Sequence, residues 1–306
     1  MGLPALRVGA VLSALGLLVG FAAVHAAPVR ADAPGQLILV FSRSIWQEDY
    51  PKCTSLVPAA RSESLGQIAT TLAGMGVTDV SASVVVNYTQ PGQNCQQGHM
   101  NYASVSDLLG LQAGGWHIFS ASVDHANMAT MTDTTQVANE SCNTIGALQA
   151  DGFTHPEAQF DYPSGKHSSL DQSIVATCFD FARYYRAANY FTATSAQAAN
   201  WLIPAYSTQG TATKYTSVAT LAQEMTPPSG TVGEVQTYQL LDGDYGTPGT
   251  GVWWTCGATE THATSMGEGY CASDFYAALQ QALAAGVTIT DPYAVSQAWG
   301  RSVPGN

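Results

Sequence analysis

The sequence is poor in charged residues, and lysine is the scarcest of them. Charged residues make up 10% of the 306 residues, and the only lysines are Lys52, Lys166 and Lys214. The net charge is −12, so no basic stripe can form. Nucleic acid is therefore not an expected partner. Hydrophobic residues make up 46% of the chain, which is enough to build a sizeable core.

The sequence also lacks the short motifs of several enzyme classes. There is no Gly-x-Ser-x-Gly elbow, no His-Glu-x-x-His pair, no phosphate loop, no dinucleotide fingerprint and no Cys-x-x-Cys. These absences argue against serine hydrolases of the elbow type, zinc proteases and nucleotide-binding proteins. Asp242-Gly243-Asp244 resembles part of a calcium loop but lacks the downstream ligands, so it predicts a turn.

Only one long apolar run is present, and it lies at the start of the chain. Arg7 precedes an apolar stretch over 8–24, and small residues follow around Ala26 and Ala31. This is the pattern of a secretory signal peptide. We expect cleavage after Ala26, with Ala31 as the second choice. The alternative is an uncleaved anchor, although the run is short for a span of about 20 residues. After cleavage the chain is expected to be secreted, with no membrane contact.

All of the cysteines follow this segment. An even number of cysteines in an exported chain predicts disulfides, and the sequence alone leaves many connectivities open. Their order in successive pairs favours Cys53–Cys95, Cys142–Cys178 and Cys256–Cys271. The last pair is the most strongly favoured, because it closes a short loop between a strand and a helix.

Predicted strands and helices alternate along the rest of the chain. Such alternation predicts βαβ units around a parallel sheet or barrel. We expect a signal peptide over 1–26, a short segment over 27–35 and one α/β domain over 36–303. The predicted strands lie at 36–41, 80–86, 116–123, 160–163, 231–241, 252–255 and 287–290, with a further strand region after Arg183. The predicted helices lie at 64–75, 104–112, 132–150, 171–176, 273–285 and 291–299.

Four segments, in this order, resemble the motifs of the polysaccharide deacetylase family (NodB homology, carbohydrate esterase family 4). Phe41 with Trp46-Gln47 stands where the first motif, Phe-Asp-Asp-Gly, belongs. The segment 116–128 is similar to the second motif, in which a strand ends in two histidines. Phe160-Asp161-Tyr162-Pro163-Ser164-Gly165 resembles the third motif. Trp253-Trp254-Thr255 before His262 resembles the last.

The resemblance implies a distorted (β/α) barrel and a metal-dependent hydrolase of amide or ester bonds. In that family an aspartate and two histidines hold a divalent metal, usually zinc, which activates water. Position by position, His125 matches a metal ligand and His262 the late histidine that protonates the leaving amine. The backbone N–H of Ser164 matches the oxyanion donor. Tyr162, Pro163, Trp46 and Trp254 are the candidate substrate-binding residues, because flat aromatic faces suit sugar rings.

The sequence departs from the family at the metal site. Ser42 and Arg43 stand at the two aspartates of the first motif, and Ala121 stands at the first histidine. Asp161 stands where many members carry an arginine. Since a methyl group and a guanidinium cannot coordinate a cation, we expect zinc to bind weakly or not at all. To rebuild a site, an acidic side chain would have to lie close to His125; the candidates are Glu48, Asp49, Asp124 and Asp161.

Other roles for the candidate residues stay open. His125 can be a buried histidine bonded to a backbone carbonyl, and His262 a loop histidine near a disulfide. Large aromatic residues often fill barrel cores instead of binding sugars.

Two hypotheses follow. In the first, the chain is a secreted deacetylase-like protein that acts on or binds extracellular or cell-wall carbohydrate, removing acetyl groups if a metal site survives. In the alternative, it is a catalytically inactive relative that binds a polysaccharide or a protein partner.

Overall fold

Seven parallel strands close into a barrel in the computed structural model. The structure describes residues 34–42, 63–89, 102–185, 190–208, 217–241, 245–246, 253–254 and 269–303. Each barrel strand pairs with the next, and β8 returns to pair with β1 through six residues from Gln36 to Phe41. The predicted fold class, a (β/α) barrel, is therefore confirmed. In barrel order the strands are β1 (Gln36–Ser42), β2 (Ser81–Val84), β3 (His117–Ser120), β4 (Gln159–Asp161), β5 (Phe181–Tyr185), β7 (Leu202–Ser207) and β8 (Val232–Thr237).

Further strands extend or flank the barrel. On its second edge, β1 pairs first with β13 (Thr288–Thr290) and then, towards its end, with β2. The short strand β6 (Tyr190–Phe191) runs antiparallel to β8. Two small ribbons lie apart from the barrel. They are β9 (Gln239–Leu241) with β12 (Gly269–Cys271), and β10 (Tyr245–Gly246) with β11 (Trp253–Trp254).

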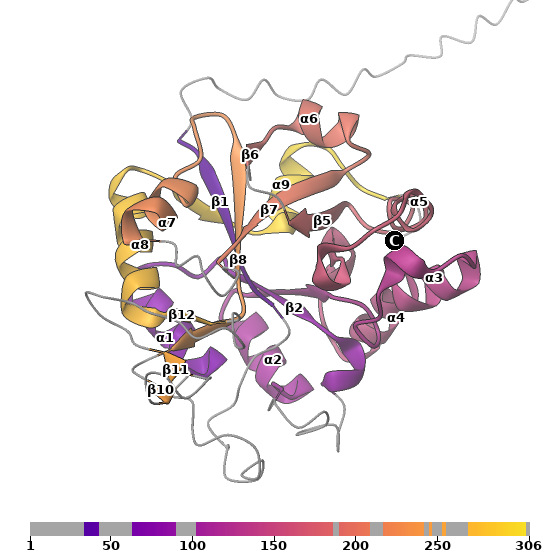
Figure 1. Cartoon of the computed structure of the whole chain (residues 1–306), viewed down its shortest axis with the longest axis horizontal. Helices are drawn as coiled ribbons and strands as arrows, with labels where there is room; N and C mark the ends of the chain where they lie inside the picture. Colours follow the sequence, from indigo (N-terminus) through magenta and orange to yellow (C-terminus); the bar gives the residue numbers. More distant parts are fainter. Residues whose placement is uncertain are drawn as a thin grey trace, which may run out of the picture.

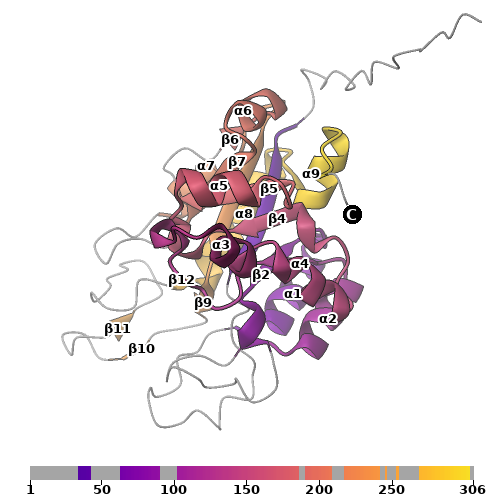
Figure 2. The same ribbon diagram turned by 90° about the vertical axis from the view of Figure 1, so that its right-hand side faces the viewer.

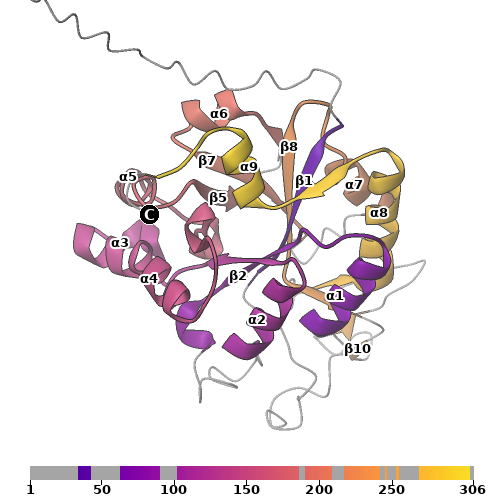
Figure 3. The ribbon, with the colours of Figure 1, turned by 180° about the vertical axis from the view of Figure 1, so that it is seen from behind.

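Helices surround the strands, as Figures 1 and 3 show from opposite sides. In Figure 2, α3, α4 and α5 lie together on one flank. The helices are α1 (Leu65–Gly74), α2 (Val105–Ala113), α3 (Thr134–Glu140), α4 (Asn143–Ala150), α5 (Ser169–Val175), α6 (Ala193–Ala198), α7 (Val218–Glu224), α8 (Ala272–Ala284) and α9 (Pro292–Ala298). None of the helices in the described part of the chain is long and apolar enough to cross a membrane.

Several helices begin at a capping box, which explains where they start. At α1 the Ser64 hydroxyl accepts from Gln67 N at 3.1 Å, and the Gln67 amide oxygen accepts from Ser64 N at 2.7 Å. Ser104 and Ser168 start α2 and α5 in the same reciprocal way. Each box satisfies two backbone groups that the first helical turn leaves unpaired.

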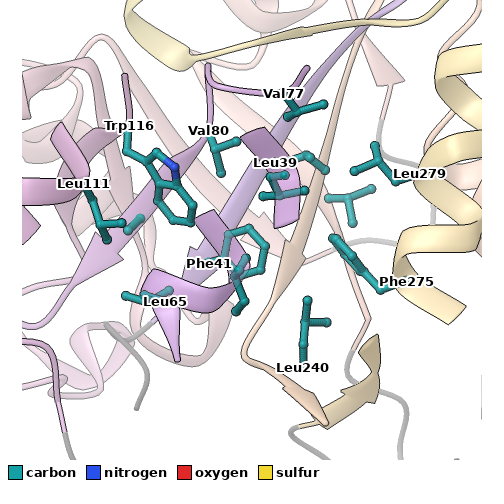
Figure 4. Packing of buried hydrophobic residues seen from close by; sticks show 14 of the residues in the cluster. Leu39, Phe41, Leu65, Val77, Val80, Leu111, Trp116, Leu240, Phe275 and Leu279 are labelled. Atoms are coloured by element: carbon teal, nitrogen blue, oxygen red, sulfur yellow. The ribbon is translucent and has the colours of Figure 1, made fainter. Parts of the chain in front are cut away.

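The strand β1 is buried on both faces, which explains its apolar sequence. Leu37, Leu39 and Phe41 face the cluster packed against the helices, where Figure 4 shows Phe41 between Trp116 and Phe275. The corresponding ring centroids lie 5.4 and 5.9 Å apart. The alternate residues Ile38 and Val40 belong to a separate apolar cluster with residues of the other strands.

This alternation determines what the interior of the barrel contains. Ile38, Phe119, Phe181, Ile203 and Val232, from five different strands, form the apolar cluster. Side chains two positions apart share one face of a strand. The residues two or four positions further along the same strands therefore also point into the barrel, closer to the C-terminal ends of the strands, and several of them are polar. They are Ser42 on β1, Arg183 on β5, and Glu234 and Gln236 on β8, all buried.

Several predicted elements differ in the structure. The strand predicted over 231–241 is two strands, β8 and β9, which pair with β1 and β12 respectively. The helix predicted over 132–150 is two helices, because Ser141 has non-helical angles of φ −120° and ψ −83°. The strand predicted over 116–123 ends at Ser120, and the chain then turns through a left-handed residue, Ser122, with φ 83°.

The predicted disulfide Cys142–Cys178 is confirmed and joins the start of α4 to the segment after α5. Cys271 is also disulfide-bonded. Its predicted partner Cys256, and the predicted pair Cys53–Cys95, lie outside the described residues.

Candidate functional site

A network of polar side chains fills the barrel where its parallel strands end. Strand pairing places Ser42 beside Ser83 and Asp161 beside Arg183. On the other side of the barrel, Val40 of β1 pairs with Gln236 of β8. These residues are all buried, although they come from five strands. Closure of the barrel therefore brings together side chains that lie far apart in the sequence.

Asp161 is the acceptor on which this network converges. Its Oδ2 atom accepts from the Ser42 hydroxyl at 3.0 Å and from the Ser83 hydroxyl at 2.8 Å. The Gln236 side-chain amide donates to the same oxygen at 3.3 Å. The guanidinium of Arg183 forms an ion pair with it as well. One carboxylate oxygen thus has four polar neighbours from four other strands.

Arg183 lies at the centre of the network and is 0% exposed. Besides Asp161, its Nε atom lies 2.9 Å from Glu234 Oε1, and its Nη1 atom donates to Gln236 Oε1. Glu234 Oε1 also accepts from the Gln159 amide at 3.0 Å. The guanidinium carbon lies 5.1 Å from the centre of the Tyr185 ring. A buried charge needs such partners, because water does not reach it.

The two buried ionisable side chains next to Asp161 have shifted pKa values. Burial raises the pKa of Glu234 to about 8, although Arg183 opposes the shift. For Arg183, burial acts against the charge, but Asp161 foremost, with Tyr185 and Glu234, raises the pKa of the guanidinium above its usual range. Arg183 is therefore permanently charged, and Glu234 holds a proton near neutral pH.

His125 lies in the loop after β3, at the same end of the barrel. It has a left-handed backbone with φ 58°, and its N–H donates to the Ser122 hydroxyl at 2.8 Å. Ser122 is left-handed too, and its carbonyl accepts from Val86 N after β2. The histidine side chain is half-buried. Left-handed angles in non-glycine residues are costly and gather at functional sites.

Asp124 precedes His125 and is an exposed residue. Its carboxylate accepts from the Asn87 side-chain amide at 2.5 Å, and its backbone N–H donates to Glu140. Asp161 is held by Arg183 and the serines. Each of these two acids is thus engaged with its own partners, while Glu48 and Asp49 lie outside the described residues.

The third motif forms a short 3-10 turn, η6 (Pro163–Gly165), directly after β4. Ser164 is exposed and left-handed, with φ 57°. Tyr162 is fully buried, and its ring meets Phe160 edge-on at 5.3 Å. Burial, with a smaller effect from Asp171, raises the pKa of the Tyr162 hydroxyl well above its usual range. Tyr162 and the buried Pro163 thus form part of the core, and Ser164 is the exposed residue of this turn.

The remaining predicted site residues are Trp46, His262 and Trp254. Trp46 and His262 lie outside the described residues. Trp254 lies on β11, which pairs only with β10 among the described strands.

Comparisons with known proteins find similar barrels among solved structures. The chitin deacetylase of the fungal pathogen Colletotrichum lindemuthianum has a TM-score of 0.49 and 9% sequence identity, over 89% of this chain and 90% of that chain. The family 4 acetyl xylan esterase of Clostridium thermocellum, solved with a cobalt ion, has a TM-score of 0.46 and 11% identity, over 88% and 94%. A Streptococcus pyogenes deacetylase in complex with acetate has a TM-score of 0.42 and 13% identity, over 55% of this chain and 62% of that chain. This chain therefore spans less than two thirds of that protein.

No family model matches the sequence, and no curated protein matches it. The barrel that the motif resemblance predicts is nevertheless present. The chain resembles the polysaccharide deacetylases. The resemblance concerns the barrel, whereas Ser42, Ala121 and Asp161 inside it differ from the residues of the family motifs.

The metal site of the deacetylases can be compared with the residues that stand in its place. The Ser42 hydroxyl, at the position of an aspartate, donates a hydrogen bond to Asp161 instead of coordinating a cation. Ala121 is buried and offers only a methyl group. The described residues contain no group of three or more His, Cys, Asp or Glu side chains that could hold a metal ion. With Arg183 adding a fixed positive charge, these side chains do not fit zinc.

Sequence reasoning missed Arg183, Glu234, Gln236 and Ser83. The available signal is a charged residue inside a strand of buried neighbours, at Arg183 in β5 and at Glu234 in β8. Charged side chains are almost never fully buried unless they are paired. An ionisable residue among buried neighbours in each of these two strands therefore indicates that it pairs with another side chain inside the fold.

Proposed function

We propose that this chain is an exported, deacetylase-like protein that binds a carbohydrate polymer at the C-terminal end of its barrel, without metal-dependent removal of acetyl groups. The observation that carries the proposal is the ion pair between Arg183 and Asp161 inside the barrel. This ion pair occupies the carboxylate of Asp161 in the third motif. At the positions that correspond to metal ligands, Ser42 offers a hydroxyl and Ala121 a methyl group. The predicted signal peptide over 1–26 supports export.

The proposed binding face is formed by the loops after β3 and β4, where the backbone contains several left-handed residues. Ser122, His125 and Ser164 have left-handed angles and follow the ends of β3 and β4. In parallel barrels the loops after the strands carry ligand-binding residues. Two predicted site residues lie on this face, the half-buried His125 and the exposed Ser164. The motif resemblance to polysaccharide deacetylases supports carbohydrate as the ligand class.

Hydrolysis remains the second candidate, because His125 occupies the position of a metal ligand in the second motif. It would need His262 and an acidic side chain such as Glu48 or Asp49 to complete the site. Such an enzyme would depend on a divalent metal and would release acetate.

Cosedimentation of the purified exported chain with insoluble chitin, acetylated xylan and peptidoglycan tests the proposal, with acetate release measured in the same tubes. We expect binding to at least one polymer that a chelator does not change. His125→Ala should weaken binding by about five- to tenfold, the loss expected from one hydrogen bond. The matched control is His155→Ala, whose 46% exposed side chain pairs with Glu157 before β4.

Two results would contradict the proposal. One is acetate release that a chelator stops and that His125→Ala abolishes, which would establish the enzyme. The other is the absence of binding to all three polymers.

A further inference from the structure

We infer that Arg183 is a built-in cation that takes the place of a divalent metal in the barrel. The inference deepens the proposed function, since it gives the reason why no metal is needed. It concerns the charge inside the barrel, whereas carbohydrate binding concerns the outer loops. The two can therefore fail separately.

The atoms around the guanidinium are oxygen ligands of the kind that hard cations use. They are Asp161 Oδ2, Glu234 Oε1 at 2.9 Å from Nε, and Gln236 Oε1. Two more oxygens stand close by, because the Ser42 and Ser83 hydroxyls both bond to Asp161. The carboxylate of Asp161 and the amide and hydroxyl oxygens suit calcium, magnesium or manganese, and binding of such a cation would displace the proton of Glu234. In this chain the same oxygens surround the guanidinium of Arg183, which offers them a positive charge and one directed hydrogen bond, from Nη1 to Gln236.

The positive charge of Arg183 is needed to balance the buried carboxylate next to it. Asp161 and Glu234 are buried, and Arg183 is the one cationic side chain in the described part of this network. Removing one partner of a buried pair leaves an uncompensated charge. An uncharged residue at position 183 should therefore leave a space lined by oxygens, with one carboxylate lacking a counter-charge. A divalent cation can restore the balance there.

The experiment compares wild type with Arg183→Met, which keeps the aliphatic part of the side chain and removes the guanidinium, so that the space between the oxygens is left open and uncharged. Mn²⁺ is the probe, followed by isothermal titration and by the melting temperature. The matched control is Lys166→Met, which removes an exposed cation beside η6. The double variant Arg183→Met/Asp161→Asn removes both charges.

We expect wild type and Lys166→Met to show no Mn²⁺ binding and no change of Tm. Arg183→Met should melt lower than wild type, and saturating Mn²⁺ should bind it and raise its Tm by about 5 °C. The double variant should show no response to Mn²⁺. Arg183→Lys, which keeps a cation but loses the fork, should fold without binding Mn²⁺.

Three results would overturn the inference. The first is Mn²⁺ or Zn²⁺ binding by wild type that Asp161→Asn abolishes. The second is Arg183→Met that melts like wild type and ignores Mn²⁺. The third is Mn²⁺ binding by Arg183→Lys. If Arg183→Met does not fold, the wild-type and Arg183→Lys titrations decide the question. A failure to bind any polymer would contradict only the proposed function.

Discussion

Glu234 makes the stability of this barrel depend on pH in an unusual direction. Its pKa rises from the ordinary 4.5 to about 8 because the side chain is fully buried. Between these values the folded state binds the proton more tightly than the unfolded state does. The free energy of unfolding should therefore decrease as the pH rises through this range. At about 1.4 kcal/mol per pH unit, the full loss is about 5 kcal/mol.

Glu234→Gln tests this, because glutamine resembles the protonated acid and keeps an oxygen facing Arg183 and Gln159. The assay is urea unfolding of wild type and variant between about pH 5 and pH 9. The two proteins should have similar stabilities at the acidic end. As the pH rises, wild type should lose several kcal/mol relative to the variant.

Other groups titrate in both proteins, so the difference between the two curves isolates Glu234. Parallel curves over the whole range would refute the reasoning. They would mean that Arg183 keeps Glu234 ionised and that the network carries a net negative charge.

The disulfide and two glycines give further predictions. Replacing Cys142 and Cys178 by serine should lower the free energy of unfolding by about 4 kcal/mol, as expected for a 36-residue separation; equal urea midpoints would contradict this. Gly165→Ala should destabilise by more than about 1 kcal/mol, because φ is +65° and the new Cβ would lie 2.3 Å from the Tyr185 ring. Gly146→Ala, in open space on α4, should instead stabilise by about 0.5–1 kcal/mol. Thermal melting of the pair checks both signs.

Local patterns predicted the barrel because they recur along the chain. The apolar run over 36–41 and the helix over 64–75 were readable from residue spacing alone, and both are present as β1 and α1. The strand β7 was missed, since Pro204 interrupts its sequence and proline argues against a central strand. The short helices α6 and α7 were missed as well.

The sequence predicted only part of the candidate site. The motifs located the ends of β3 and β4, where His125 and Ser164 lie. They could not show which side chains fill the interior, because Arg183 meets Asp161 and Glu234 only after the barrel closes. The sequence showed that Asp161 reverses the charge found at this position in the family. It did not show that Arg183, on the neighbouring strand β5, is the partner of Asp161. Long-range pairing of this kind leaves no local signal beyond a charged residue in a buried strand.

The metal content of the purified protein tests the central claim most directly. The wild-type chain is incubated with zinc and manganese, desalted and analysed by mass spectrometry of the elements, alongside His125→Ala. The account predicts far less than one metal ion per chain in both proteins. One tightly held ion per wild-type chain, lost in His125→Ala, would contradict it and would establish a rebuilt metal site.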